Sequence, residues 1–229
     1  MTQLHPIDMK QMRQNFIHFA ITQKVLRFGE FQTKAGRLSP YFFNAGLFNE
    51  GASLKHLTQF YAQTILVSGI NFDMLYGPAY KGIPLAAGTA ISMMEQGRNV
   101  PYCFNRKEVK EHGEGGNTIG AKLQGNVLIV DDVISAGTSV RESIDIIRAA
   151  GATPCGVVIA LDRMEVGQQT HPDEKKLSAT QEVQRTYKIP VIAIATLDDL
   201  LGYLQNDEQM VQNLQAVKNY RNRYGVPHE

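Results

Sequence analysis

The sequence predicts an α/β fold in which a mostly parallel sheet is flanked by helices. Residues 127–130 are apolar and mostly β-branched, as in a buried parallel strand. A loop of small residues follows, and then a helical pattern places Val140, Ile144 and Ile147 on one face. A second strand-to-helix pattern covers residues 72–94. Strands that alternate with helices in this way predict parallel strands joined by crossover helices.

Length and composition limit the classes to which the protein can belong. With 229 residues, 43% of them hydrophobic, the chain can form a large core in one α/β domain with a small appendage. Lysine and arginine total 23 against 22 acidic residues, and this net charge of +1 argues against a nucleic-acid-binding protein. No apolar run approaches the roughly 20 residues of a membrane-spanning helix. Cys103 and Cys155 have apolar, strand-like neighbours, which predicts buried reduced thiols and a cytoplasmic protein.

The N-terminal part is expected to form a helix and then a hairpin. Apolar residues recur at helical spacing and predict a helix over about 8–28 that ends at Gly29. Residues 31–44 have β-rich flanks around an Ala-Gly-Arg turn, which predicts a hairpin. Taken alone, its Lys34 and Arg37 could be solvated turn charges, and its three consecutive aromatic residues could form a small core.

A second helix, a strand and a third helix are expected next. Ser53 can cap the second helix, which should end near Gly69, and residues 72–76 have the pattern of a short strand. The third helix is expected to carry the apolar residues Ile83, Ala87, Ile91 and Met94.

The turn before this third helix is Gly-Pro-Ala-Tyr-Lys-Gly, from Gly77 to Gly82. The two glycines would let a ligand approach the backbone closely, and the turn would lie beside the one that follows strand 127–130. The alternative is a merely structural turn that leaves Lys81 exposed.

After the next predicted strand the composition changes abruptly. Residues 105–116 combine glutamates and glycines with Arg106, Lys107, Lys110 and His112. A mobile, solvated loop is the simplest interpretation. The alternative is a lid, because long glycine-containing loops are often functional and these cations could bind a diphosphate.

Two adjacent carboxylates, Asp131 and Asp132, stand where strand 127–130 should end. Ligands of open α/β sheets bind beyond the carboxyl ends of strands, and the backbone N–H groups of 135–139 would begin the next helix, where a phosphate is favoured. The acids could then accept hydrogen bonds from ribose hydroxyls or lie near a hydrated Mg²⁺. The alternative is that they only cap the following helix. No Walker A sequence occurs.

The next strand is expected at 155–161, with Arg163 just beyond its carboxyl end. Taken alone, Arg163 could form an ordinary ion pair with Asp162 or Glu165 at the end of the strand.

The remaining elements have weaker signals. Residues 167–179 should be an irregular loop before a short helix, and residues 189–195 a final strand with Pro190 at an edge or entry position. A helix near the C-terminus should carry Met210, Val211, Leu214 and Val217. The tail, residues 221–229, is expected to be disordered or bound to the surface.

Three segments resemble one family of enzymes. The string from 127 to 139 resembles the phosphoribosyl-diphosphate (PRPP) signature of the type I phosphoribosyltransferases. Within that family, Lys-x-Gly-Arg-x-Ser-Pro-Tyr-Phe-Phe-Asn at 34–44 resembles the N-terminal hood of the orotate phosphoribosyltransferases, and residues 105–116 resemble their catalytic loop. One departure is Ser135, where the family often has Thr; this keeps the hydroxyl and loses a methyl contact.

The resemblance implies specific site residues. It assigns catalysis to Arg106, Lys107, Lys110 and His112, and Lys110 is expected to have the largest effect on the rate. Orotate binding falls to Phe42, Phe43, Ser135 and Arg163. PRPP binding falls to Lys34, Tyr80, Lys81, Arg106, Lys107, Lys110, His112, Asp131, Asp132, Val133, Ile134, Ser135, Ala136, Gly137, Thr138 and Ser139.

The implied reaction joins orotate to PRPP and gives orotidine 5′-monophosphate and diphosphate, a step in UMP synthesis. Mg²⁺ is expected to bind through the diphosphate and water, without a cluster of protein ligands. The chain would be one phosphoribosyltransferase domain, 1–229, with a hood formed mainly by residues 28–48 or so. It would form a homodimer in which loop 105–116 of one subunit reaches the active site of the other. One alternative is transfer to another base, but the hood aromatics and Arg163 argue against it. The other is a PRPP-binding regulator without catalysis, which would need a DNA-binding element that the sequence does not show.

Overall fold

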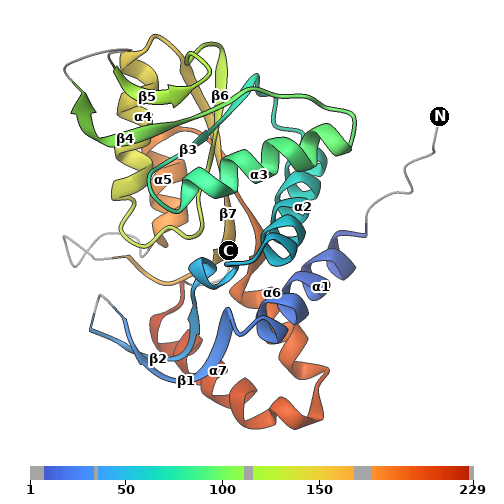
Figure 1. The fold of residues 1–229 in the computed structure, drawn as a ribbon. Coiled ribbons are helices and arrows are strands. Elements are labelled where there is room, and N and C mark those ends of the chain that lie inside the picture. Colours follow the sequence, from blue (N-terminus) through green and yellow to red (C-terminus); the bar gives the residue numbers. More distant parts are fainter. Residues whose placement is uncertain (1–7, 34–35, 111–115, 168–176, 227–229) are drawn as a thin grey trace.

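A computed structural model of the protein describes residues 8–33, 36–110, 116–167 and 177–226, and describes only the backbone of 108–110. In this part of the chain, a mixed sheet has the strand order β5-β4-β3-β6-β7-β8, and a separate antiparallel hairpin is formed by β1 and β2 (Figure 1). All neighbouring strands of the larger sheet are parallel except β4 and β5. The predicted α/β class with a mostly parallel sheet is therefore confirmed.

The described strands are β1 (Leu26–Gln32), β2 (Leu38–Phe43), β3 (Met74–Gly77), β4 (Tyr102–Lys110), β5 (Gly116–Gly120), β6 (Asn126–Val130), β7 (Thr153–Asp162) and β8 (Val191–Thr196). The described α-helices are α1 (Met9–Thr22), α2 (Gly51–Ser68), α3 (Gly82–Glu95), α4 (Thr138–Ala149), α5 (Ala179–Tyr187), α6 (Leu197–Gln205) and α7 (Val211–Tyr224). Two short 3₁₀ helices, η1 (Ala45–Leu47) and η2 (Glu208–Met210), complete the set.

The sheet separates two hydrophobic cores, and central strand β6 contributes to both. Leu128 and Val130 pack in the core that contains α2 and α3, whereas Val127 and Ile129 pack in the core under α4 and α5. Alternate residues of a strand point to opposite faces, so a continuous apolar run buries both sides. With helices on both faces, the carboxyl ends of β3, β6 and β7 come out at one edge of the sheet.

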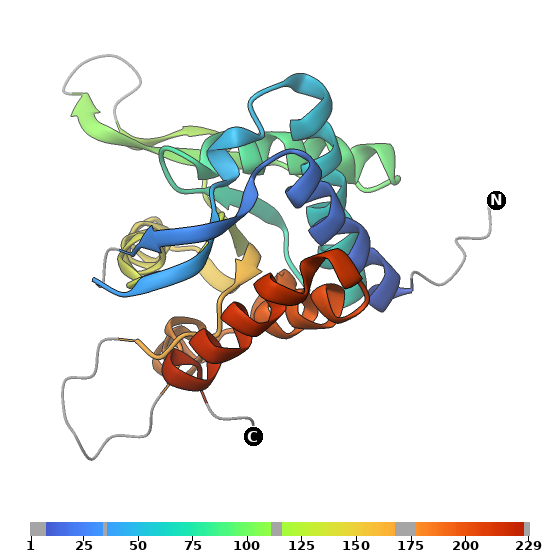
Figure 2. The ribbon, with the colours of Figure 1, turned by 90° about the horizontal axis from the view of Figure 1, so that it is seen from below.

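The hairpin at this edge is supported by both ends of the chain (Figure 2). Helices α1, α6 and α7 pack in the same core as Tyr41 and Phe43 of β2, and α7 contacts β2 directly. The tail was expected to be disordered or surface-bound, and for 221–226 this is wrong: α7 continues to Tyr224, and Val226 is buried. Its distant partners, in β2 and in residues 164–166 after β7, account for the error, because no local pattern marks them.

Two boundaries differ from the sequence-based expectations. The first helix ends at Thr22 rather than near Phe28, because Lys24 adopts φ +56° and the following buried residues form β1. Helix α2 begins after Glu50, and Ser53 is its third residue, where it forms a capping box with Glu50. Apolar spacing alone did not distinguish the last turn of α1 from the start of a strand.

Residues 105–116 were expected to form a loop, but 105–110 and 116 belong to β-strands, and 111–115 lie outside the described residues. Strand β4 continues to Lys110 and pairs with β5, where Lys110 lies opposite Gly116. Most residues of this segment are charged or polar, so no apolar alternation marks the strand in the sequence and the composition resembled that of a loop.

Helix α3 turns a different face to the core from the one expected. Ile91 and Met94 are 59% and 51% exposed, while Leu85, Ala86 and Met93 are buried. Apolar residues surround this helix, so periodicity could not select its buried face.

Candidate active site

The backbone around the acid pair is held by neighbouring strands and one helix. The Asp131 N–H donates to the Val158 carbonyl at 3.0 Å, and the Asp132 carbonyl accepts from the Ala160 N–H at 2.9 Å. The buried Tyr61 hydroxyl of α2 donates to the Asp131 carbonyl at 2.7 Å. The two acids are therefore fixed at the carboxyl end of β6, as the sequence predicted.

Both carboxylates are largely buried, and they do not cap the next helix. Asp131 accepts from the Asp132 N–H at 2.9 Å and from the Ser139 hydroxyl at 3.0 Å, and Asp132 accepts from the Val133 N–H at 2.9 Å. The N-cap of α4 is Gly137, which has no capping side chain. Burial, together with the neighbouring Asp132 charge, raises the pKa of Asp131 to about 6. An acid kept in this environment without a capping function is typical of a ligand site.

The loop after the acids forms an exposed cradle of backbone donors. Gly137 has φ +71°, a conformation that favours glycine, and residues Ser135, Ala136, Thr138 and Ser139 are exposed. Because no side chain caps α4, its first N–H groups remain available to a ligand. These donors and the helix dipole favour an anion such as a phosphate.

The β3–α3 turn brings a cation to the acid pair. Lys81 Nζ lies 2.6 Å from Asp132 Oδ2, although the Lys81 side chain is 54% exposed. Tyr80 beside it is 71% exposed, and the Ala79–Tyr80 peptide bond is cis. The Ala79 N–H donates to Asn105 Oδ1 at 2.7 Å, so the base of the ribbon holds this turn in place.

The two glycines of this turn serve a different purpose from the one expected. A Cβ on Gly77 would lie 2.1 Å from the Gly82 carbonyl oxygen, and a Cβ on Gly82 would lie 2.5 Å from Pro78 Cδ. The expectation that they admit a ligand is not supported by these contacts, because the space beside each glycine is filled by the chain itself.

The end of β7 carries Arg163 beneath the hairpin. Its Nε donates to Glu165 Oε1 at 2.8 Å and its Nη2 donates to Ser39 Oγ at 3.1 Å, while its Cζ lies 4.4 Å from the ring centroid of Tyr41. The suggested ion pair with Glu165 is therefore present. Asp162, the other suggested partner, instead accepts from the Met164 N–H and the Thr180 hydroxyl.

The two hood phenylalanines have different surroundings. Phe42 is 36% exposed and stacks on Phe31 with ring centroids 5.4 Å apart, whereas Phe43 is 8% exposed and packs near Phe16. Adjacent strand residues point to opposite faces, so only Phe42 offers its ring to a ligand. The contact of Phe43 with orotate stays a prediction.

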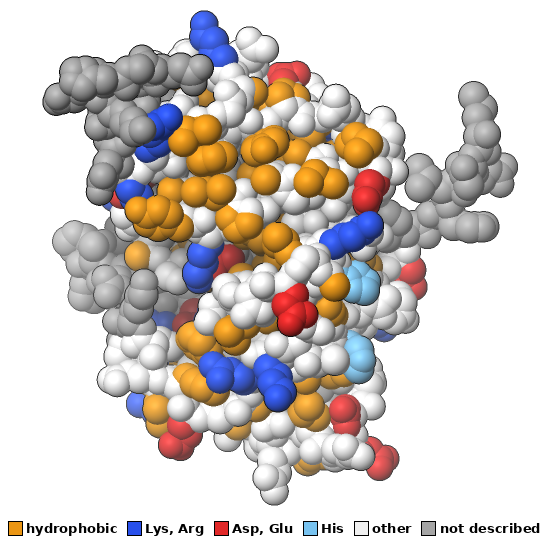
Figure 3. Space-filling view, viewed as in Figure 1, with side chains coloured by type: hydrophobic (Ala, Val, Ile, Leu, Met, Phe, Trp, Pro, Cys, Tyr) orange, Lys and Arg blue, Asp and Glu red, His pale blue; other side chains and the backbone are white. Residues whose placement is uncertain are grey.

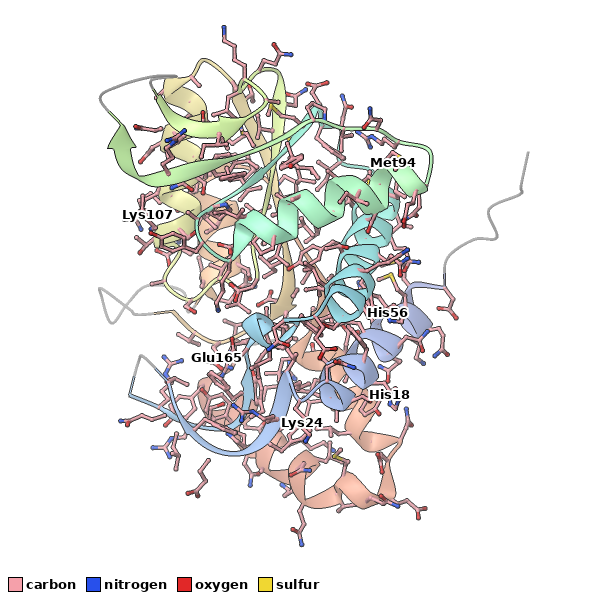
Figure 4. The ribbon with its side chains drawn as sticks, viewed as in Figure 1. His18, Lys24, His56, Met94, Lys107 and Glu165 are labelled. Atoms are coloured by element: carbon pink, nitrogen blue, oxygen red, sulfur yellow. The ribbon has the colours of Figure 1, made fainter. Side chains whose placement is uncertain are left out.

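The remaining expected cations lie on the β4–β5 ribbon or outside the described residues. Lys107 is exposed at the side of β4 (Figure 4), and Arg106 is partly buried, with no hydrogen-bond partner for its Nε among the described residues. Only the backbone of Lys110 is described, and Lys34 and His112 lie outside the described part. The structure thus gathers Asp131, Asp132, Lys81 and the 135–139 cradle into one site, and Arg163 lies beneath the neighbouring β1–β2 hairpin.

Sequence reasoning missed several residues that shape this site: Ser39, Tyr61 and Asn105. Ser39 and Asn105 lie in segments whose sequence already indicated a site, whereas no local pattern marks Tyr61. Among the described residues, no group of three or more His, Cys, Asp or Glu side chains could hold a metal ion, and no helix is long and apolar enough to cross a membrane. The arrangement of phosphate cradle, acid pair and lysine suits a sugar phosphate that carries a further anionic group.

Known proteins share both the sequence and the fold. Residues 46–196 match the phosphoribosyl transferase domain family. The chain is 64% identical over 218 residues to an orotate phosphoribosyltransferase of Laribacter hongkongensis, covering 95% of this chain and 100% of the relative. It is 62% identical to that of Chromobacterium violaceum, with coverages of 95% and 99%. The crystal structure of the Francisella tularensis orotate phosphoribosyltransferase matches with a TM-score of 0.80 at 41% identity, over 93% of this chain and 100% of that one.

Proposed function

Since this chain belongs to the orotate phosphoribosyltransferase family, we propose how its described residues bind PRPP and orotate and transfer the phosphoribosyl group between them. The observation that carries the proposal is the meeting of Lys81, the acid pair and the open 135–139 backbone at one edge of the sheet. This arrangement matches the three parts of PRPP, namely its diphosphate, its ribose and its 5′-phosphate.

Each part of PRPP has its own set of contacts in this proposal. The N–H groups of 135–139 bind the 5′-phosphate at the start of α4. Asp131 and Asp132 accept hydrogen bonds from the ribose hydroxyls, which an ionised carboxylate does well. Lys81, Tyr80 and the ribbon cations bind the diphosphate, and Lys34 and His112 join them according to the family resemblance.

Orotate is proposed to bind between the cradle and the hood. Arg163 offers a planar guanidinium to the carboxylate of the base, and the half-exposed ring of Phe42 can stack on the pyrimidine. Ser135 lies at the other side of the base in this arrangement. A base without a carboxylate would leave Arg163 without its ligand, which favours orotate over uracil or a purine.

The chemistry is a displacement at the anomeric carbon of ribose, and no nucleophilic side chain is needed. As diphosphate departs, the ribose develops oxocarbenium character, so catalysis depends on stabilising the leaving group and positioning the base. Lys81, Arg106, Lys107 and Lys110 would stabilise the negative charge that collects on the departing diphosphate. Asp131 and Asp132 would hold the ribose in place for attack by the base.

Mg²⁺ fits this site only through the substrate and water. Each oxygen of Asp131 and Asp132 already accepts one hydrogen bond, and the Lys81 ion pair occupies the outer face of Asp132. The acids could therefore hold Mg²⁺ through its hydration water. When bound, the ion would neutralise and orient the diphosphate.

The test is to follow orotate absorbance after mixing the protein with PRPP, with and without Mg²⁺. Lys110→Ala is compared with Lys122→Ala, an exposed lysine that follows β5 and serves as the control. We expect orotate to be consumed only with Mg²⁺, and the rate to fall by about 10²–10³ in Lys110→Ala and to stay unchanged in Lys122→Ala.

Two other outcomes would change the proposal. Consumption of hypoxanthine or uracil in place of orotate would contradict the hood assignment and keep the phosphoribosyl transfer. PRPP binding without consumption of any base would point to a regulator that senses PRPP.

A homodimer is also part of the proposal. The outer face of α3 and the neighbouring part of the sheet expose Tyr80, Ile91, Met94 and Tyr102, and apolar side chains gather there in the space-filling view (Figure 3). An exposed apolar patch of this kind is typical of a protein interface. Ile91→Asp should convert the dimer to a monomer in sedimentation, whereas Val211→Asp on distant α7 should leave it unchanged.

Mixing two inactive variants tests whether the ribbon serves the partner's site. In an equal mixture, about half of the dimers would pair a Lys110→Ala chain with an Asp132→Asn chain, and each of these would contain one intact site out of two. About a quarter of the wild-type activity should therefore return. No recovery in confirmed heterodimers would show that the ribbon acts in its own chain.

A cytoplasmic location is proposed from the cysteines. Both are free, and burial raises the pKa of the Cys103 thiol to about 12 and that of Cys155 to about 11. Cys103 is buried as predicted, whereas Cys155 is only partly buried. Thiols that stay protonated in such surroundings are suited to a reducing compartment.

A further inference from the structure

Three charged side chains meet where the end of β7 lies under the hairpin. Glu165 accepts from Arg163 Nε at 2.8 Å, and its other oxygen lies 3.7 Å from Nη1 of Arg37. None of the three side chains is more than 20% exposed. Figure 4 shows Glu165 between the sheet and the hairpin.

Glu165 therefore connects the hood to the strand end. Arg37 lies in the turn between β1 and β2, where its Nη2 also donates to the Val166 carbonyl at 2.9 Å. Arg163 belongs to the segment that follows β7. The Glu165 carboxylate thus links the Arg163 guanidinium beside the sheet to the Arg37 guanidinium of the hairpin turn, and the orientation of both guanidinium groups depends on it.

The charges of the cluster do not cancel. Among the described residues, two guanidinium groups share one carboxylate, which gives this three-residue cluster a net charge of +1 in a largely buried place. Asp162 forms no ion pair with either guanidinium in the described part of the chain, and its two oxygens accept from the Met164 N–H at 2.9 Å and the Thr180 hydroxyl at 2.8 Å. A partly buried positive charge is stabilised by an anion, and one carboxylate would complete the balance.

One buried polar atom beside the cluster is also without a partner: the Tyr41 hydroxyl has no hydrogen-bond partner among the described residues. The Tyr41 ring lies under the Arg163 guanidinium. The Tyr220 hydroxyl lies beside Arg163 and Glu165, and burial together with the Glu165 charge raises the pKa of Tyr220. An unsatisfied buried hydroxyl next to a guanidinium indicates a polar place that the described residues alone do not fill.

We propose that Glu165 is a positioning residue for base recognition. Its carboxylate holds the Arg163 guanidinium over Tyr41 and couples it to Arg37, so that Arg163 is oriented for the carboxylate of orotate before the base arrives. The proposal rests on the proposed binding of orotate by Arg163. Preorganisation of this kind lowers the cost of binding the base and leaves PRPP binding unaffected.

The experiment compares steady-state constants for Glu165→Ala, Glu165→Gln and Arg163→Ala, with exposed Glu208→Gln as the matched control. Glu165→Ala should raise the KM for orotate about tenfold, with less change in kcat and a KM for PRPP within about twofold of wild type. Glu165→Gln should lie between wild type and alanine, because its amide oxygen can still accept from Arg163 Nε. Glu208→Gln should match the wild type.

The other outcomes separate this inference from the proposed function. An unchanged or lowered orotate KM in Glu165→Ala, or an equal rise for both substrates, overturns the positioning of Arg163. If Arg163→Ala itself leaves the orotate KM unchanged, the proposed base site is wrong as well. Should Glu165→Ala not fold, Glu165→Gln decides: a selective rise in the orotate KM supports the inference, and an unchanged value overturns it.

Discussion

Two strand-to-helix turns lie at the same edge of the sheet, and they offer different groups to a ligand. The β6–α4 turn is open: Gly137 has a positive φ, no side chain caps the helix, and the backbone donors are exposed. The β3–α3 turn is closed, because Gly77 and Gly82 pack against each other. The first turn can bind through its backbone, whereas the second has its glycines packed against the chain itself and offers the exposed side chains of Tyr80 and Lys81.

The two turns therefore tolerate different substitutions. A closed turn depends on the small size of its glycines, while its exposed side chains can be exchanged without unfolding the protein. An open turn tolerates added atoms but depends on the direction of its N–H groups. Four substitutions test this contrast.

Gly77→Ala should have the largest effect. Its Cβ would lie 2.1 Å from the Gly82 carbonyl oxygen and 2.8 Å from Ala86 Cβ, so the turn and α3 would have to separate. We expect a loss of more than about 4 kcal/mol in the free energy of unfolding, measured by urea denaturation. Gly51→Ala, with open space around its Cβ, is the control, and a Gly77→Ala protein as stable as that control would contradict the closed turn.

Lys81→Ala should leave the fold intact and impair catalysis. The side chain is half-exposed and its ion-pair partner is Asp132, so removing it takes a cation from the diphosphate site without disturbing the core. We expect kcat/KM for PRPP to fall by about 10²–10³ while the melting temperature changes little. A large loss of stability at unchanged kcat/KM would show that Lys81 acts only in the structure.

Asp131→Asn should stabilise the protein at neutral pH and weaken PRPP binding. The pKa of Asp131 is raised to about 6, mainly by burial, above its ordinary value of 3.8. Ionised Asp131 therefore opposes folding above pH 6, and this cost disappears as the pH falls toward 4. At pH 8 the variant should be more stable by about 1–3 kcal/mol, a gain that vanishes near pH 4 in denaturation curves. A gain that is independent of pH would contradict the assigned pKa.

Gly137→Ala should have the smallest overall effect of the four substitutions. The nearest atom to its Cβ would be Val183 Cγ2 at 3.6 Å, so only the φ of +71° is unfavourable. We expect a loss of about 1 kcal/mol in stability and a rise of a few fold in the KM for PRPP. If Gly137→Ala were as destabilising as Gly77→Ala, the contrast between the two turns would be wrong.

The acid pair and the cradle could be predicted from sequence because they are local. Strand β6, the two acids and the start of α4 lie within consecutive residues, and apolar runs and loop composition report such neighbours directly. The structure confirmed the strand, the hairpin and the helix that ends before Gly151. The family resemblance was confirmed by the relatives.

The parts that could not be predicted depend on distant contacts. Tyr61 hydrogen-bonds the Asp131 backbone across 70 positions, and the C-terminal helix packs on β2 near the other end of the chain. The buried face of α3 was missed for a related reason. Its exposed Ile91 and Met94 are more hydrophobic than its buried Ala86, and only the surroundings of the helix determine which of them is covered.

Asn105 has a consequence for anyone who exchanges ribbons between relatives of this protein. Its side-chain oxygen accepts from the Ala79 N–H, and its backbone lies at the root of the projecting β4–β5 arm. The arm and the Lys81 turn thus share one anchor. A chimaera that imports a new arm must therefore keep an amide at this position, or the graft will also misplace a lysine that was never exchanged.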